Sequence, residues 1–122
     1  MSNYATENLR TLALVGHGSC GKTTLIEAML YRAGMIPEMG SIQRGTTMCD
    51  NDLLEKEVGH SIRLAVAHID TAMTDLTPVR IHILDTPGYP DYLGQDMSAL
   101  DAVKSVCAVI DPTKGPELLT RR

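Results

Sequence analysis

The chain lacks tryptophan and phenylalanine altogether, and only four of its 122 residues are tyrosines. Hydrophobic types still make up 43% of the sequence, so a core can form from leucine, isoleucine, valine, alanine and seven methionines. Three cysteines, an odd number, argue against a disulfide scaffold and favour a reducing compartment. There is no signal-peptide pattern and no apolar run long enough to cross a bilayer, so we expect a cytoplasmic protein without a membrane partner.

Clusters of basic residues are also missing. The net charge is −4, and no stripe of lysine and arginine is interleaved with aromatic residues, so we expect no direct nucleic-acid surface. The four histidines are scattered along the chain, which argues against a histidine metal cluster. The length allows at most one small domain.

The strongest motif is the segment Gly16–Thr23, which reads G-H-G-S-C-G-K-T and fits the phosphate-binding loop G-x-x-x-x-G-K-[ST]. Residues 9–15 before it form a short apolar run typical of a buried strand. Residues 22–33 after it have apolar side chains at helical spacing. Lys22 is expected to reach the β- and γ-phosphates, and the Thr23 hydroxyl to bind Mg²⁺. The helix N-terminus adds its dipole to the same site.

A second motif, Asp85-Thr86-Pro87-Gly88, ends a β-rich run that begins at residue 79. At the end of a strand beside the phosphate loop, Asp85 is expected to hold Mg²⁺ through a bound water. The N–H of Gly88 is expected to donate to a γ-phosphate oxygen, because glycine lets the backbone approach closely. The spacing of about sixty residues from the phosphate loop indicates a GTPase.

These motifs predict an α/β fold with three layers and a partial, mostly parallel sheet. A turn at 75–78 predicts that the second and third strands form one antiparallel hairpin.

In the second strand Ile62, Leu64 and Val66 alternate with Arg63, Ala65 and Ala67, as in a half-exposed strand. The sequence Glu55-Lys56-Glu57 is interpreted as a solvated helix face. The expected strands are 9–15, 62–67, 79–85 and 105–110, the expected helices are 22–33, 53–57 and 91–103, and residues 35–49 are expected to form a loop.

Taken together, the motifs resemble the N-terminal GTPase domain of bacterial elongation factor G and its relatives. That family typically reads A-H-x-D-A-G-K-T-T, G-T-T, E-R-G-I-T-I and D-T-P-G-H-x-D-F. The chain looks most like a divergent elongation-factor-G-like branch, in which tyrosine follows D-T-P-G. The matching segments here are Gly16 to Leu25, Gly45-Thr46-Thr47, Glu57 to Ile62 and Asp85 to Tyr92.

The resemblance implies a P-loop GTPase fold that binds GTP or GDP with Mg²⁺ and acts on the ribosome in translocation. It implies that residues 40–62 and 85–95 are the two switches. It assigns catalytic roles to Lys22, Gly88 and Tyr89. The implied metal-binding residues are Thr23, Ser61 and Asp85, and the implied nucleotide-binding residues are His17, Gly18, Ser19, Cys20, Gly21, Lys22, Thr23, Thr24, Asp85 and Gly88.

Three residues depart from the family pattern. Ser19 replaces an aspartate that helps hold a monovalent cation, and Ser61 replaces a threonine whose hydroxyl role serine can keep. Tyr89 replaces the histidine that orients the attacking water. Tyrosine is a poor base at neutral pH. Two interpretations of Tyr89 stay open: its hydroxyl hydrogen-bonds the water, or its ring only packs in a slow GTPase.

The motif Asn-Lys-x-Asp, which reads the guanine base in the family, does not occur in the sequence. We therefore expect residues 1–122 to be the N-terminal part of a longer GTPase, with the apolar strand 105–110 left as a bare sheet edge. A release-factor-3-like or ribosomal-protection GTPase is one alternative. A non-hydrolysing nucleotide-binding interaction module is the other.

Overall fold

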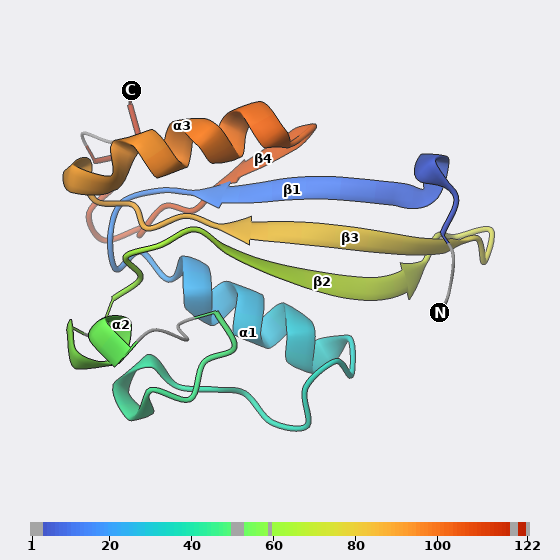
Figure 1. The fold of residues 1–122 in the computed structure, drawn as a ribbon, viewed down its shortest axis with the longest axis horizontal. Coiled ribbons are helices and arrows are strands. Elements are labelled where there is room, and N and C mark those ends of the chain that lie inside the picture. The colour runs from blue at the N-terminus through green and yellow to red at the C-terminus, as the bar shows by residue number, and fades with distance from the viewer. Residues whose placement is uncertain (1–3, 50–52, 59, 118–119, 122) are drawn as a thin grey trace.

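The computed structural model describes residues 4–49, 53–58, 60–117 and 120–121. Figure 1 shows a sheet with one helix above it and another below it. The strands are β1 Leu9–Val15, β2 Ala65–Ala72, β3 Pro78–Asp85 and β4 Ser105–Ala108, the α-helices are α1 Lys22–Arg32, α2 Leu53–Val58 and α3 Leu93–Ala102, and the short 3₁₀ turns are η1 Thr6–Asn8, η2 Ile42–Arg44 and η3 Pro90–Tyr92.

The four strands lie in the order β2-β3-β1-β4. Strand β1 is parallel to β3 and to β4, and β2 is antiparallel to β3, which confirms the mostly parallel sheet with one hairpin. The carboxyl ends of β1 and β3 therefore meet at one edge of the sheet. The β2–β3 turn lies at the opposite end (Figure 1). Ligand sites of open α/β sheets form at the carboxyl edge, so this edge is where the site is expected.

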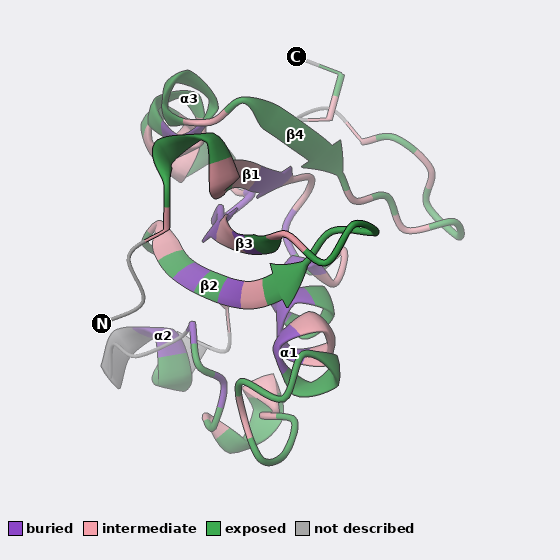
Figure 2. Cartoon of the chain, turned by 90° about the vertical axis from the view of Figure 1, so that its right-hand side faces the viewer, coloured by how far each residue is buried: buried purple, intermediate pink, exposed green. Residues whose placement is uncertain are grey.

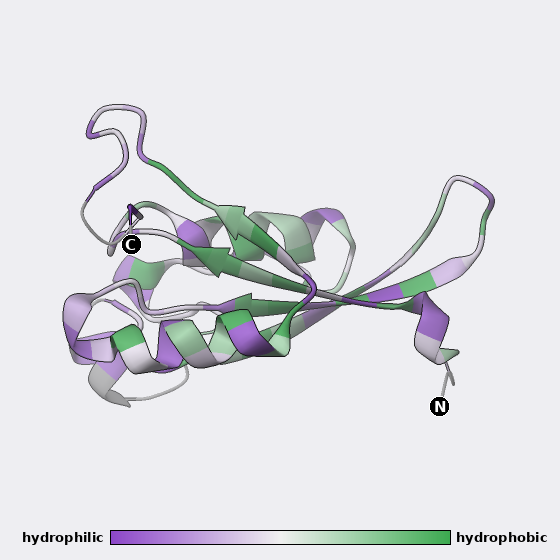
Figure 3. Cartoon of the chain, turned by 90° about the horizontal axis from the view of Figure 1, so that it is seen from above, coloured by the Kyte–Doolittle hydropathy of each residue, from purple (hydrophilic) through white to green (hydrophobic). Residues whose placement is uncertain are grey.

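The two faces of the sheet are covered by different helices. Helix α1 packs on one face and contributes Ile26 and Leu30 to a buried cluster, whose other members are Leu14, Cys49, Ala67, Ile69 and Ile83. Helix α3 packs on the other face, where the buried cluster consists of Ala13, Leu84 and Ala99. Figure 3 shows hydrophobic residues gathered on the strands and helices in the middle of the molecule and more hydrophilic residues in the loops at both ends.

The prediction for the second strand was wrong in its bounds and in its inward face. The strand runs from Ala65 to Ala72, so Ile62 and Leu64 precede it. Ala67 and Ile69 are buried against α1, whereas Val66 is 64% exposed. The register against β3 sets this orientation, because Ala67 pairs with buried Ile83 and Val66 pairs with Leu84 on the other face. A shift of the strand register by one residue moves every side chain of the strand to the opposite face of the sheet.

The fourth strand is at the edge of the sheet, as expected, but it is shorter than predicted. All four residues of β4 are exposed (Figure 2), although most of them are apolar. Two apolar residues of α3 are also partly exposed, since Met97 is 55% and Leu100 is 37% accessible. Among the described residues, no helix combines the length and the apolar character needed to cross a membrane.

Candidate nucleotide-binding site

The loop between β1 and α1 has a strongly curled backbone. Gly16, Ser19 and Gly21 all have positive φ, at +152°, +62° and +99°. Repeated left-handed residues turn successive N–H groups toward one concave side, which is a geometry suited to binding an anion. Helix α1 starts directly after this loop, at Lys22, so its N-terminus faces the same concavity. We call residues 16–21 the phosphate loop.

Lys22 lies across the phosphate loop rather than extending into solvent. Its ammonium donates to the carbonyl oxygens of Gly16, at 3.0 Å, and His17, at 2.9 Å, and its Nζ is 3.9 Å from the Cys20 sulfur. The residue is only 5% exposed. A buried ammonium requires hydrogen-bond acceptors, and the loop carbonyls provide them. The positive charge is therefore held at the mouth of the loop, where a phosphate oxygen would be an additional acceptor.

Three oxygen-bearing side chains from separate segments meet beside Lys22. The Thr23 hydroxyl donates to Asp85 Oδ2 at 2.6 Å, and the Thr23 and Ser61 hydroxyls are 3.2 Å apart. Asp85 is 1% exposed and Thr23 is 6% exposed. Hydroxyl and carboxylate oxygens are the donor types that Mg²⁺ takes in proteins, so the three residues fit that ion. The fold thus brings together Thr23, Ser61 and Asp85, the three residues that were predicted to bind the metal.

The D-T-P-G segment packs directly onto the phosphate loop. The buried Thr86 hydroxyl donates to Leu14 O of β1 at 2.9 Å, which fixes the segment after β3. At Gly88, which has φ +76°, a Cβ atom would lie 2.3 Å from both Lys22 Nζ and Gly16 O. Only glycine fits this position, both because of its φ and because of the space. The backbone of Gly88 therefore stands beside the ammonium group of Lys22.

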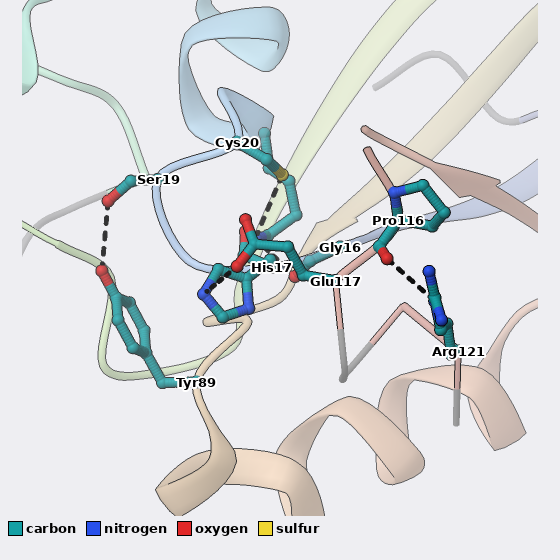
Figure 4. Close-up of polar contacts among 9 residues, drawn as sticks. Gly16, His17, Ser19, Cys20, Tyr89, Pro116, Glu117 and Arg121 are labelled. Carbon is teal, nitrogen blue, oxygen red and sulfur yellow. Dashed lines mark hydrogen bonds and ion pairs between the residues drawn. The ribbon is translucent and has the colours of Figure 1, made fainter. Parts of the chain in front are cut away.

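Tyr89 lies over the phosphate loop. Its hydroxyl is 3.2 Å from Ser19 Oγ (Figure 4). Its ring centroid is 4.4 Å from that of His60. Together these side chains line a cavity of about 40 Å³. The described residues around this cavity are Ser19, Gly21, Lys22, Thr23, Ile42, His60, Ser61, Thr86, Pro87 and Tyr89.

Six residues predicted for the nucleotide site do not line this cavity: His17, Gly18, Cys20, Thr24, Asp85 and Gly88. The His17 imidazole points toward the segment after β4, where its Nε2 is 3.0 Å from a Glu117 carboxylate oxygen (Figure 4). Thr24 is exposed on the first turn of α1 and lines a separate cavity with Gly40 and Thr47. Its place in the nucleotide site remains a prediction.

Two buried glutamates organise the segment between α1 and β2, and the sequence motifs did not indicate them. Glu27 on α1 is 1% exposed, and its carboxylate accepts hydrogen bonds from the N–H groups of Gly40 and Met48. Glu55 accepts from the N–H groups of Ile62 and Arg63, at 2.9 and 3.0 Å. Glu55 is only 5% exposed, so the interpretation of 55–57 as a solvated face was wrong for this residue. The available signal was weak: Glu27 lies next to Ile26 and three residues before Leu30, on the inward side of α1.

Helix α3 contributes one more carboxyl group near the site. Burial raises the pKa of Asp96 above its usual range, and the Thr86 hydroxyl, the Gly88 N–H and the charge of Lys22 oppose this rise. Gln95, its neighbour, accepts from Leu64 N–H at 2.7 Å and donates to Ile62 O at 3.2 Å. The start of α3 therefore contacts both the D-T-P-G segment and the residues that follow Ser61.

Comparison with known proteins places this geometry in a family. The family described as the elongation factor Tu GTP binding domain matches residues 7–122. The tetracycline resistance protein TetM from transposon Tn1545 of Enterococcus faecalis is 36% identical over 110 residues, which is 90% of this chain and 16% of that protein.

Solved structures agree with this match. A protein of Thermus thermophilus has a TM-score of 0.83 at 35% identity, over 93% of this chain and 16% of that one. A bacterial selenocysteine-specific elongation factor has a TM-score of 0.69 at 25% identity, over 92% of this chain and 16% of that one. The chain thus spans about a sixth of the length of each of these proteins. It belongs to the elongation factor Tu GTP binding domain family, the GTP-binding domain of translation GTPases.

Proposed function

We propose that residues 1–122 are the N-terminal part of the GTPase domain of an elongation-factor-G-like protein. The protein would bind GTP or GDP with Mg²⁺ in the cytoplasm, hydrolyse GTP and act on the ribosome in translocation. The observation that carries the proposal is the meeting of three side chains beside Lys22, where the Thr23 hydroxyl is within hydrogen-bond distance of both Ser61 and Asp85. These residues come from three segments that share no local reason to meet.

The reaction would be in-line attack of water on the γ-phosphate, for which the protein supplies position and charge. The N–H groups of the phosphate loop and the Lys22 ammonium would neutralise the phosphate oxygens. Thr23 and Ser61 would hold Mg²⁺ directly and Asp85 through water, and the ion supplies further charge neutralisation when it is bound. The Gly88 N–H would donate to the γ-phosphate, since its backbone already stands beside Lys22.

The comparisons give some support to a related role on the ribosome. A ribosomal-protection GTPase is the second candidate, because the tetracycline resistance protein TetM is 36% identical over 90% of this chain. A release-factor-3-like protein is a further member of the same class. Ribosome-dependent translocation, peptide release and relief of tetracycline inhibition are separate assays, so the full-length protein can be assigned among them directly.

A non-hydrolysing interaction module is the rival from another class. It is supported by the Tyr89 hydroxyl, which already has Ser19 as a partner instead of being directed at a nucleophile. Phosphate release measured with GTP, with and without ribosomes, separates the two. Ribosome-stimulated turnover would exclude the module, and tight GTP binding without turnover would exclude the enzyme.

Lys22→Ala in the full-length protein tests the nucleotide site itself. Charge-assisted hydrogen bonds are about twice as strong as neutral ones, so GDP affinity should fall on the order of 100-fold. Lys104→Ala is the matched control, because Lys104 is an exposed lysine that precedes β4. Isothermal calorimetry with GDP measures both variants. If Lys22→Ala bound GDP as tightly as the native protein does, the assignment of the phosphate loop would be overturned.

A further inference from the structure

Ser19 and Tyr89 form a polar contact between two segments that are 70 residues apart. The two hydroxyl oxygens are 3.2 Å apart, and either can be the donor. Figure 4 shows Tyr89 reaching from the segment before α3 toward the phosphate loop, with its hydroxyl directed at Ser19. The contact therefore joins the second switch, residues 85–95, to the loop proposed to hold the phosphates.

The phosphate loop is shaped to accept the tyrosine ring. A Cβ atom at Gly18 would lie 2.3 Å from Cζ of Tyr89 and 2.6 Å from two other ring atoms. Real Cβ atoms do not approach so closely, so glycine at position 18 is what lets the ring lie flat on the loop backbone. Ser19 follows with φ +62°, which is uncommon for a residue with a side chain. This backbone conformation directs the serine side chain toward the tyrosine.

A third residue completes the contact. The His60 ring lies 4.4 Å from the Tyr89 ring, with 37° between their planes, and His60 immediately precedes Ser61. Tyr89 thus contacts the phosphate loop on one side and the first switch, residues 40–62, on the other. All three residues line the cavity that also contains Lys22 and Thr23.

The cavity that these residues line is small. Its volume is about 40 Å³, well below the several hundred Å³ of an ordinary small-molecule site. A triphosphate that contacts Lys22 and Thr23 needs room on the side where Tyr89 and His60 now lie. The Tyr89 ring must therefore move, or the segment that carries it must shift, when such a ligand enters.

We propose that Ser19, His60 and Tyr89 form a clasp that closes the phosphate site before nucleotide binds, with Ser19 as the positioning residue that holds the Tyr89 hydroxyl. The inference rests on the proposed function, because the clasp has a role only if a nucleoside triphosphate enters this cavity. Binding then requires the open state, and the closed state competes with the ligand. The measured affinity is reduced by the fraction of molecules that are open.

The expected change in triphosphate binding follows from the loss of one hydrogen bond. A neutral hydrogen bond contributes a modest net free energy, so its loss should raise the ratio of open to closed molecules about five-fold. When the closed state dominates, the association rate and the affinity for a triphosphate rise by the same factor. Removal of the second hydroxyl should add nothing further, because the bond is already lost.

The test is the binding of N-methylanthraniloyl-GTP to the full-length protein, followed by stopped-flow fluorescence. Ser19→Ala and Tyr89→Phe should each bind about five-fold faster than the native protein, and the double variant should match the single ones. Ser19→Asn should restore slow binding, since asparagine tolerates left-handed backbone and offers a polar partner. Tyr31→Phe is the control, because Tyr31 is 48% exposed on α1, and its binding rate should equal the native rate.

The outcomes separate the clasp from the proposed function. If the native protein binds the analogue but the single variants keep its association rate, the clasp is wrong and the nucleotide site stands. Additive effects in the double variant would also overturn the clasp, because the two hydroxyls would then act independently. If the native protein binds neither the analogue nor GDP, the proposed function fails and the clasp fails with it.

Discussion

The two faces of the sheet are built from side chains of different size. On the α1 face, Leu14, Ile26 and Ile83 are at most 1% exposed. On the α3 face, the buried cluster contains two alanines and Leu84, and Met97 and Leu100 of α3 keep contact with solvent. Stabilisation is roughly proportional to the apolar area that is buried. Helix α1 is therefore fixed to the sheet more firmly than α3, because larger apolar side chains are buried on its face.

This difference matches what each helix has to do in the proposed site. Helix α1 carries Lys22 and Thr23, which must hold their positions relative to β1 and β3. Helix α3 begins within residues 85–95, the proposed second switch, and Asp96 contacts Thr86 and Gly88 of that segment. A helix held by small side chains can shift at a lower free-energy cost than one held by large ones. In the proposed site, the firmly packed face would support phosphate binding, and the less firmly packed face would allow the proposed second switch to move.

The largest expected effect is on the free energy of unfolding. It comes from substitutions at two neighbouring residues of β3 that point to opposite faces of the sheet. Ile83→Ala should reduce the free energy of unfolding by about 4 kcal/mol, and Leu84→Ala by about 2–3 kcal/mol, because Ile83 has more large neighbours to lose contact with. Val106→Thr on exposed β4 should change it by less than about 0.5 kcal/mol. Urea denaturation of the three variants measures the free energy of unfolding. Equal costs for Ile83→Ala and Leu84→Ala would remove the distinction between the faces.

A smaller effect should come from the Glu27 carboxylate, which holds residues 40–48 of the proposed first switch to α1. Glu27→Ala leaves the N–H groups of Gly40 and Met48 without their acceptor, so the free energy of unfolding should fall by about 1–3 kcal/mol. Amide hydrogen exchange at residues 40–48 should also become faster. Glu38→Ala, at an exposed position in the same segment, is the matched control and should leave both measurements unchanged. A stable Glu27→Ala variant with native exchange rates would show that α1 does not hold this segment.

The smallest expected effect is a difference in pH dependence between two aspartates. The Arg80 guanidinium, bound to Asp70 at 2.6 and 2.7 Å, holds the pKa of Asp70 below its usual value. Its contribution to stability is therefore present above the usual pKa and is lost as the pH falls through the lower, folded pKa. Burial raises the pKa of Asp96, so stability contributed by its protonated form is lost as the pH rises through the higher, folded pKa.

Thermal unfolding between pH 3 and pH 7 tests these opposite signs. Asp70→Asn should lower the unfolding temperature more at pH 7 than at pH 3, because the stability contributed by the ionised carboxylate falls as the pH falls. Asp96→Asn should raise it at pH 7 and leave it unchanged at pH 3. Parallel pH profiles for the two variants would contradict the assignment of both pKa shifts.

Much of this arrangement was predictable because it depends on short segments. The phosphate loop between a buried strand and a helix follows from Gly16 to Thr23 and its apolar flanks. The antiparallel hairpin follows from the turn at 75–78. The end of β3 at Asp85 was placed correctly, because the apolar run stops at a charged residue before Pro87. The bounds of β2 were not predicted correctly, because Ile62 and Leu64 carry the same alternating pattern as the strand itself.

Local sequence was enough to predict the phosphate loop and the helix that follows it, because glycine content, apolar spacing and the G-K-T motif act within a few residues. Three further features emerged from the folded chain alone: Val66 faces solvent, Glu27 and Glu55 are buried, and Tyr89 contacts Ser19. Each of these depends on strand register or on contacts between segments distant in the chain. Such contacts are set by the packing of the whole fold, and local pattern carries little information about them.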